Sequence, residues 1–184
     1  MEENKKTSFI KELLLFLKDF VVCAAVVLVV THWFVRPIQV LGSSMYPTLE
    51  DQEIGISNVL GAKLRHFERF DIAIVYVEQK DEYLVKRIVG LPGETVRYSD
   101  GQLYINDEPI EENFLDTDYR RSWAGIFMGD VDEITLGEDE YFCLGDNRPR
   151  SSDSRVYGPF SGDKILAKGT FIIFPFSKIG PHTW

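Results

Sequence analysis

Apolar residues form one long run near the N-terminus and only short, alternating runs elsewhere in the chain. Residues 20–35 (FVVCAAVVLVVTHWFV) carry no formal charge apart from His32. As an α-helix they would span about 24 Å, and about 34 Å if the helix begins at residue 13, against roughly 30 Å for a bilayer core. The pattern predicts a transmembrane anchor over residues 20–36, beginning near residue 13 if Lys18 reaches the headgroups. A buried core helix is the alternative.

Basic residues are distributed unevenly around this run. Four lysines precede it, and Arg36 is the only Lys or Arg between it and Lys63. Cytoplasmic flanks carry the excess of positive charge, so we expect residues 1–19 in the cytoplasm and residues 37–184 outside. The run continues into THWFVRP, which has no small-x-small cleavage site. The anchor is therefore expected to stay attached.

Beyond the anchor the period changes from helical to alternating. Residues 71–77 (DIAIVYV) and 83–89 (YLVKRIV) are short, β-branched and bounded by polar residues or glycine. Similar strands are predicted over residues 95–98, 103–105, 141–144 and 170–174. The tetrapeptide SDGQ around Gly101 predicts a hairpin turn. Residues 111–137 are polar and irregular, which indicates a loop or insertion. The fold expected for residues 37–184 is all-β, with a mostly antiparallel sheet.

Composition excludes several classes of function. The chain has 20 Lys+Arg against 29 Asp+Glu, a net charge of −9, which disfavours nucleic acid as a partner. Two cysteines and three histidines show no metal-ligand spacing, so no metal site is indicated. Cys23 falls in the anchor and Cys143 outside, so the two are not expected to form a disulfide.

A candidate nucleophile follows closely behind the anchor. Residues 42–49 (GSSMYPTL) place two hydroxyls on a turn that contains glycine and proline. Ser44 is seven residues beyond Pro37, so it lies within about 23 Å of the membrane surface even on an extended chain. A serine in such a turn is more commonly structural. There is no Gly-x-Ser-x-Gly motif, which disfavours an α/β-hydrolase.

A candidate base lies in the strand expected over residues 83–89. Alternation places Lys86 on the same face as Leu84 and Ile88. A free lysine is almost fully protonated at pH 7, but burial among apolar side chains lowers its pKa toward the range of a general base. A lysine that protects the edge of a sheet is the alternative interpretation.

A third polar cluster follows the strand expected over residues 141–144. Residues 145–155 (GDNRPRSSDSR) contain no apolar side chain except Pro149. The cluster is either an Asx-rich surface turn or a platform whose hydroxyls orient a lysine amine. In the second case Asp153 would pair with Arg155 or Arg87.

Three segments, in this order behind one anchor, resemble bacterial type I signal peptidases. They are SMYPTL (44–49), KRIVGLPGE (86–94) and GDNR with SSDSR (145–155). Arg69-Phe70-Asp71 matches a further family segment of Arg-Gly-Asp form, with Phe70 in place of glycine. The resemblance extends from the anchor to the Phe-Pro-Phe at residues 174–176, and the short length is similar to the Gram-positive form.

The resemblance implies a role for each matching position. Ser44 would be the nucleophile, Lys86 the general base and Ser151 the hydroxyl that orients the lysine amine. Structural supports would be Arg87, Asp146, Arg148, Asp153 and Arg155. Substrate pockets would involve Val40, Met45, Leu84 and Val85. The backbone amide of Ser44 would supply one oxyanion donor. Gly42 stands where some members carry a second donor, which leaves Ser43 or water as candidates.

The function expected from this resemblance is removal of signal peptides from exported preproteins. Cleavage would follow a small-x-small site and pass through an acyl-enzyme at the bilayer, without a cofactor. A self-cleaving regulator of the repressor type is disfavoured by the anchor. A catalytically inactive, membrane-anchored β-domain that acts as a binding module is the main alternative. A Ser-His-Asp triad would need His66 or His182, and neither lies in a recognisable motif.

Overall fold

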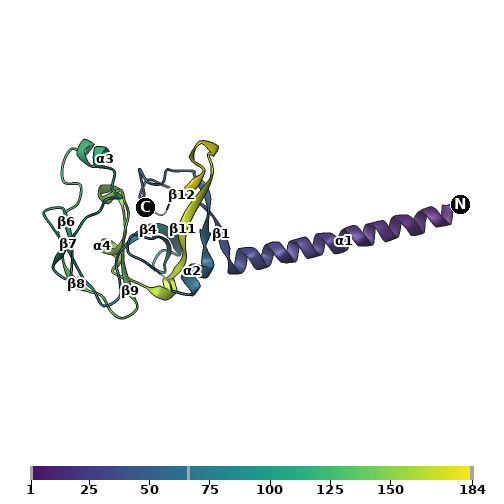
Figure 1. Cartoon of the computed structure of the whole chain (residues 1–184), viewed down its shortest axis with the longest axis horizontal. Coiled ribbons are helices and arrows are strands. Elements are labelled where there is room, and N and C mark those ends of the chain that lie inside the picture. The colour runs from purple at the N-terminus through teal and green to yellow at the C-terminus, as the bar shows by residue number, and fades with distance from the viewer. Residues whose placement is uncertain (1, 66, 183–184) are drawn as a thin grey trace.

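A single long helix projects from a domain built of strands (Figure 1). The computed structural model describes residues 2–65 and 67–182. Helix α1 (Glu2–Trp33) contains an apolar stretch, Ile10–Trp33, long enough to cross a membrane. Its large apolar side chains are exposed rather than packed on the domain, which contradicts a buried core helix. The helix ends before residues 35 and 36, which were expected in the anchor and instead begin strand β1 (Val35–Gln39).

Short contacts join the end of α1 to the domain. Helix α2 (Val59–Lys63) lies beside it, and Lys63 Nζ donates a hydrogen bond of 3.1 Å to the backbone oxygen of His32. The same ammonium lies 4.2 Å from the centre of the Trp33 ring, a cation–π contact. A lysine at the C-terminal end of a helix also interacts favourably with the helix dipole. The end of α1 is therefore held to the domain by side-chain contacts as well as by the covalent backbone.

The strands form two sheets, and every pairing in the described part of the chain is antiparallel. The larger sheet has the order β1-β2-β11-β3-β4-β9-β10, with β12 also paired to β11. Its further strands are β2 (Ile54–Asn58), β3 (Ile72–Val77), β4 (Glu82–Gly90), β9 (Glu140–Leu144), β10 (Phe160–Ser161), β11 (Ile165–Phe174) and β12 (Gly180–His182). The smaller sheet, β7-β6-β5-β8, contains β5 (Thr95–Ser99), β6 (Gln102–Ile105), β7 (Glu108–Ile110) and β8 (Val131–Thr135). The predicted all-β, antiparallel fold is confirmed.

All six strands predicted from alternation are present, as β3, β4, β5, β6, β9 and β11. The segment 111–137, expected as a loop or insertion, contains helix α3 (Thr117–Ser122) as well as β8, which pairs with β5. Strand β8 was missed because two of its residues, Asp132 and Glu133, are both acidic and exposed. The other short helices are α4 (Ser154–Tyr157) and the 3-10 turns η1 (Arg148–Arg150), η2 (Gly162–Lys164) and η3 (Phe176–Lys178).

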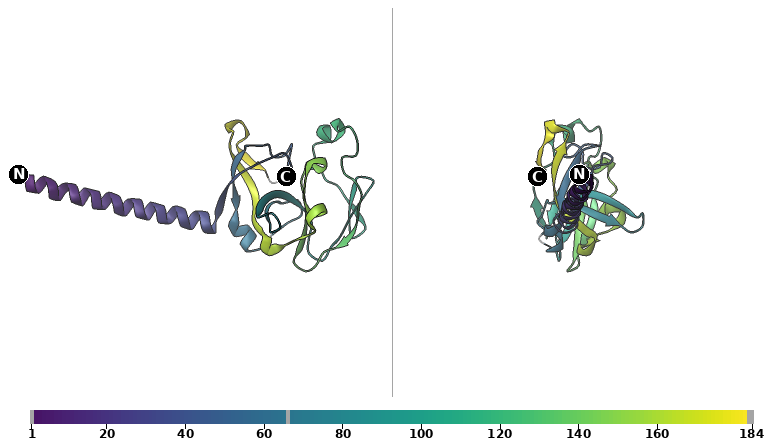
Figure 2. Two further views of the ribbon diagram at one scale, coloured as in Figure 1. Left: turned by 180° about the vertical axis from the view of Figure 1, so that it is seen from behind. Right: turned by 90° about the vertical axis from the view of Figure 1, so that its right-hand side faces the viewer.

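The two sheets share a core at β4 and β9. The smaller sheet lies at the end of the domain farthest from α1, as both views from the side show (Figures 1 and 2). Val89 and Leu144 of the larger sheet pack with Val96 and Leu103 of the smaller one, and all four are fully buried. On the other face of β4, Ile88 packs with the buried Cys143. Strands β4 and β9 are thus held on both faces, which fixes the segments that follow them.

Candidate active site

The side chains of Ser44 and Lys86 meet although 42 positions separate them in the sequence. Lys86 Nζ lies 2.8 Å from Ser44 Oγ and donates a hydrogen bond to it. A second hydrogen bond of 3.0 Å runs from Nζ to the backbone oxygen of Val85. Ser44 lies on the turn after β1, and Lys86 lies in the middle of β4. A hydroxyl held directly against an amine is the arrangement that nucleophilic catalysis needs.

Burial sets the protonation of this amine. Lys86 is only 1% exposed, and the apolar Leu84 and Ile88 lie on the same face of its strand. Burial lowers the pKa of Lys86 from 10.5 to about 8, although the carboxylate of Asp153 raises it in part. At pH 7 the neutral fraction is then about 9%, compared with roughly 0.03% for a free lysine. The interpretation of Lys86 as an exposed edge-strand lysine is therefore wrong.

The neighbouring Arg87 forms a fully buried ion pair with Asp146. Arg87 Nε and Nη2 donate to the two oxygens of Asp146 at 2.9 and 2.7 Å, and both side chains have no exposure. Thr48 Oγ1 donates to the same carboxylate at 2.5 Å. Asp146 thus connects β4 to the loop that carries Ser44. A bidentate pair of this kind fixes geometry as well as charge.

Phe70 accepts a third hydrogen bond from Arg87, through its backbone oxygen at 2.8 Å. Its φ is +74°, in the left-handed region that favours glycine, the residue usual at this position in the family segment. The phenylalanine ring packs at 4.8 Å from the Phe114 ring, which offsets part of the backbone strain. Phe70 therefore holds a backbone conformation that glycine adopts without strain.

Asp153 pairs with Arg155, which decides between the two partners that the sequence allowed. The carboxylate accepts from Arg155 Nε and Nη2, each at 2.8 Å, and from the backbone amide of Gly145 at 3.0 Å. Burial would by itself raise the pKa of Asp153, but the Arg155 guanidinium and the Gly145 amide hold it below its ordinary value. Asp153 is therefore a fixed negative charge near Lys86 at neutral pH.

Arg148 is buried and pairs with an acid that sequence reasoning missed. Its guanidinium donates to Glu112 at 2.7 and 3.2 Å and to the hydroxyl of Tyr98 at 2.9 Å. Its Nε also donates to the backbone oxygen of Gly145 at 3.0 Å. Glu112 lies in the segment expected as a loop, 36 positions away, and no local spacing in the sequence connects the two. Glu112 and Tyr98 thus belong to the platform behind the site.

Ser151 lies close to the site, but it does not hold the lysine amine in this structure. Its buried Oγ makes no hydrogen bond to Lys86 Nζ, and it lies instead beside the Asp153 carboxylate, whose pKa it helps to lower. It packs on Gly145, where an added Cβ would come within 2.2 Å of Ser151 Oγ and 2.5 Å of the Ser44 backbone oxygen. Lys86 Nζ instead donates to Val85, whose carbonyl lies on its own strand. The role expected of Ser151 stays a prediction.

Three of the four expected pocket residues lie together. Val40, Met45 and Val85 belong to one apolar cluster beside the Ser44 turn, with Val40 and Met45 almost completely buried. Leu84 belongs instead with Ile88, in a separate apolar cluster on the other face of β4. The difference follows from strand alternation, which sends Leu84 and Val85 to opposite faces.

Within the described residues, no histidine is hydrogen-bonded to Ser44 Oγ, and Gly42 has no side chain that could donate a hydrogen bond. Ser44 Oγ accepts from Lys86 rather than from a histidine. His182 ends β12 and lines a shallow hollow with Pro47 and Thr48, while His66 lies outside the described residues. Gly42 has φ +86°, and its amide donates to Asp51 at 2.8 Å. Its positive φ explains a glycine at this position of the turn.

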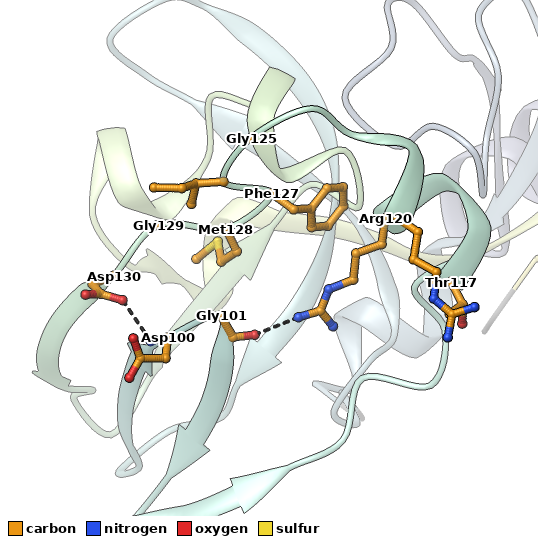
Figure 3. A pocket seen from close by; sticks show the side chains of 11 residues that line it. Asp100, Gly101, Thr117, Arg120, Gly125, Phe127, Met128, Gly129 and Asp130 are labelled. Carbon is orange, nitrogen blue, oxygen red and sulfur yellow. Dashed lines mark hydrogen bonds between the residues drawn. The ribbon is translucent and has the colours of Figure 1, made fainter.

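A second hollow, of about 700 Å³, lies between α3, the β5–β6 turn and residues 125–130 (Figure 3). Arg120 reaches across it to donate to the backbone oxygen of Gly101 at 3.0 Å, and the Asp100 amide donates to Asp130 at 2.9 Å. Neither Ser44 nor Lys86 lines this hollow. The hollow is separate from the serine–lysine site, and the Arg120 hydrogen bond across it attaches α3 to the smaller sheet.

Signal peptidases are among the known proteins that this chain is similar to. The family model described as signal peptidase, peptidase S26, matches residues 13–174. Signal peptidase I of Bacillus licheniformis is 34% identical over 182 residues, which are 97% of this chain and 98% of that protein. Signal peptidase I T of Bacillus subtilis (strain 168) is 35% identical, over 88% and 86%. A crystal structure of a signal peptidase I from Enterococcus faecalis V583 has a TM-score of 0.52 at 35% identity, covering 55% of this chain and 95% of that one.

Proposed function

Because the chain belongs to the signal peptidase family, peptidase S26, and is a serine protease of that family, we propose that it removes signal peptides with a dyad of Ser44 and Lys86. The family supports removal of signal peptides from preproteins. The observation that carries the proposal for this chain is the 2.8 Å hydrogen bond from a buried lysine to Ser44 Oγ. Burial lowers the pKa of that lysine to about 8, within reach of a general base at working pH.

The first half of the proposed reaction forms an acyl-enzyme. Neutral Lys86 accepts the proton of Ser44 while Ser44 Oγ bonds to the carbonyl carbon of the scissile peptide. The developing negative charge on the carbonyl oxygen is stabilised by the backbone amide of Ser44. Lys86 then donates the proton to the nitrogen of the leaving amine. The mature protein departs, and the signal peptide remains as an ester on Ser44.

The second half returns the enzyme to its starting state. Lys86 takes a proton from water as the water oxygen attacks the ester carbonyl. The bond to Ser44 Oγ breaks, the proton returns to that oxygen, and the signal peptide leaves with a new carboxyl end. Ser151, whose Oγ makes no hydrogen bond to Lys86 Nζ in this structure, would orient the amine during these proton transfers.

The substrate binds as an added strand beside β4. Residues 82–86 pair with β3 on one side, whereas pairing with β9 begins only at Arg87. The other edge of this half-strand is therefore open to an extended peptide. Val40, Met45 and Val85 supply the apolar surface for small residues at −1 and −3. Leu84, on the opposite face of β4, would contact the side chains of the peptide that point to that face.

The anchor delivers this site to the bilayer. An apolar N-terminal helix in a signal peptidase is a membrane anchor. We further propose that residues 1–19 lie in the cytoplasm, that the apolar helix from residue 20 (or from about 13) to Trp33 forms the anchor, and that the strands from Val35 onward form an extracytoplasmic domain, following the lysine asymmetry. Exported preproteins held by their own signal helices would meet the site there. In intact cells, an external protease should therefore reach the strand domain.

Cleavage of a purified preprotein in detergent tests the proposal. The wild type should give a product whose new N-terminus follows a small-x-small sequence, and Ser44→Ala and Lys86→Ala should each abolish it. Ser99→Ala and Lys80→Ala serve as matched controls outside the site and should keep wild-type rates. Loss with Ser44 but not with Lys86 would remove the lysine from the mechanism. No cleavage of several preproteins by folded wild type would favour an inactive, anchored binding domain.

A further inference from the structure

Asn147 holds both carbonyl groups that flank the reactive serine. Its side-chain Nδ2 donates to the backbone oxygen of Ser43 at 2.8 Å, and its backbone amide donates to the backbone oxygen of Ser44 at 3.0 Å. Asn147 is 1% exposed, so water does not compete for these groups. The turn hydrogen bond from the Tyr46 amide to Ser43 is longer, at 3.2 Å. The side chain of Asn147 is therefore the closest donor on the Ser43 carbonyl.

Fixing this carbonyl also fixes the amide of Ser44. The Ser43 C=O and the Ser44 N–H belong to one trans peptide group, which is planar, so the two bonds point in opposite directions. A donor that holds the oxygen on one side directs the N–H toward the other. The Ser44 amide has no acceptor within the described residues. A hydrogen bond to the carbonyl also polarises the peptide and strengthens its N–H as a donor.

Tyr119 in turn holds Asn147. Its hydroxyl donates to Asn147 Oδ1 at 3.0 Å, which leaves Nδ2 as the end of the amide that faces Ser43. The Tyr119 ring packs edge-on against Tyr46 at 4.9 Å. Helix α3, which carries Tyr119, is capped by Asp116 and attached to the β5–β6 turn through Arg120 (Figure 3). Tyr119 and Asn147 therefore connect the smaller sheet to the Ser44 turn.

We propose that Asn147, fixed by Tyr119, is a positioning residue that directs the Ser44 amide at the oxyanion formed during cleavage. This inference rests on the proposed function, because it assigns a task within that reaction. With Gly42 unable to supply a side-chain donor, the Ser44 amide carries more of the oxyanion's charge. The direction of this one N–H should then affect the rate of the chemical step more than the binding of the substrate.

Steady-state cleavage of a preprotein by the full-length protein in detergent tests this role. Asn147→Ala should lower kcat about 10- to 100-fold, since loss of a whole oxyanion donor costs roughly 100- to 1,000-fold. KM should change by less than about twofold, and the acidic limb of the pH–rate profile should stay where the wild type has it. Tyr119→Phe should lower kcat by a smaller factor, and Tyr76→Phe, which removes another hydrogen-bonded tyrosine hydroxyl, serves as its matched control.

A pair of peptide inhibitors separates positioning from general disruption. A peptide aldehyde ending in alanine is attacked by Ser44 Oγ, whose proton passes to Lys86, and its carbonyl oxygen becomes an oxyanion; the matching peptide alcohol does not react. Asn147→Ala should weaken the aldehyde about as much as it lowers kcat and leave the alcohol unchanged. Equal weakening of both, or a wild-type kcat, would overturn the inference. If Asn147→Ala melts early, Tyr119→Phe decides by the same comparison. A wild type that cleaves nothing would instead overturn the proposed function.

Discussion

Replacing Lys86 by methionine should make the domain more stable at pH 7 while it abolishes cleavage. Methionine has nearly the same length and no charge, so it fits a site that is 1% exposed. A pKa lowered from 10.5 to about 8 means that folding buries an ammonium that the unfolded chain keeps in water. At 1.36 kcal/mol per pKa unit, this costs about 3 kcal/mol at pH 7.

The net effect also includes the hydrogen bonds that methionine cannot make. Lys86 donates to Ser44 and to Val85, and each bond contributes about 1 kcal/mol. The variant should therefore be more stable than the wild type by about 1 kcal/mol at pH 7. Because the folded pKa lies below the unfolded one, the cost of burying the charge is complete below about pH 8 and fades as the pH rises toward 10.5. By pH 10 the wild type should be the more stable of the two by about 1 kcal/mol.

Urea unfolding followed by circular dichroism, on both proteins in the same detergent at pH 7 and pH 10, measures this difference. Groups other than Lys86 titrate alike in the two proteins, so their effects cancel. The stability difference between variant and wild type should change by about 2.5 kcal/mol between the two pH values, in favour of the wild type at high pH. A difference that is the same at both values would refute the assignment of a buried, titrating lysine.

Three further changes test the surroundings of the dyad. The rate of cleavage should fall about tenfold per pH unit below pH 8, where Lys86 becomes protonated. Asp153→Asn should move this acidic limb to lower pH, because the Asp153 carboxylate raises the pKa of Lys86. A pH–rate profile of both proteins measures the shift. Arg87→Met should destabilise the domain by roughly 3–5 kcal/mol, since it leaves the buried Asp146 without its partner, and adding Asp146→Leu should restore part of that loss in urea unfolding. Gly145→Ala should cost roughly 1–3 kcal/mol and lower kcat, because its Cβ would come within 2.5 Å of the backbone oxygen of the nucleophilic serine.

The patterns along the chain were sufficient for the anchor helix, for six of the twelve strands in the described residues and for the candidate residues. A long apolar run with lysines on one side predicts an anchor helix, and alternation predicts β3 and β4. The same alternation places Lys86 on an apolar face of its strand. Local patterns of this kind depend on which face of an element meets water, and each element carries that information in its own residues.

Tertiary structure alone decided how the candidates are arranged. Burial of Lys86, and with it the lowered pKa, depends on neighbours from β3 and β9 that no property of the strand itself specifies. Asn147 meets Ser43 across 104 positions, and Arg148 meets Glu112 across 36. Contacts at such separations are set by how sheets pair and pack, so their spacing in the sequence carries no signal. For the same reason the segment 111–137 resembled a loop: its α3 and β8 are held by residues elsewhere in the chain.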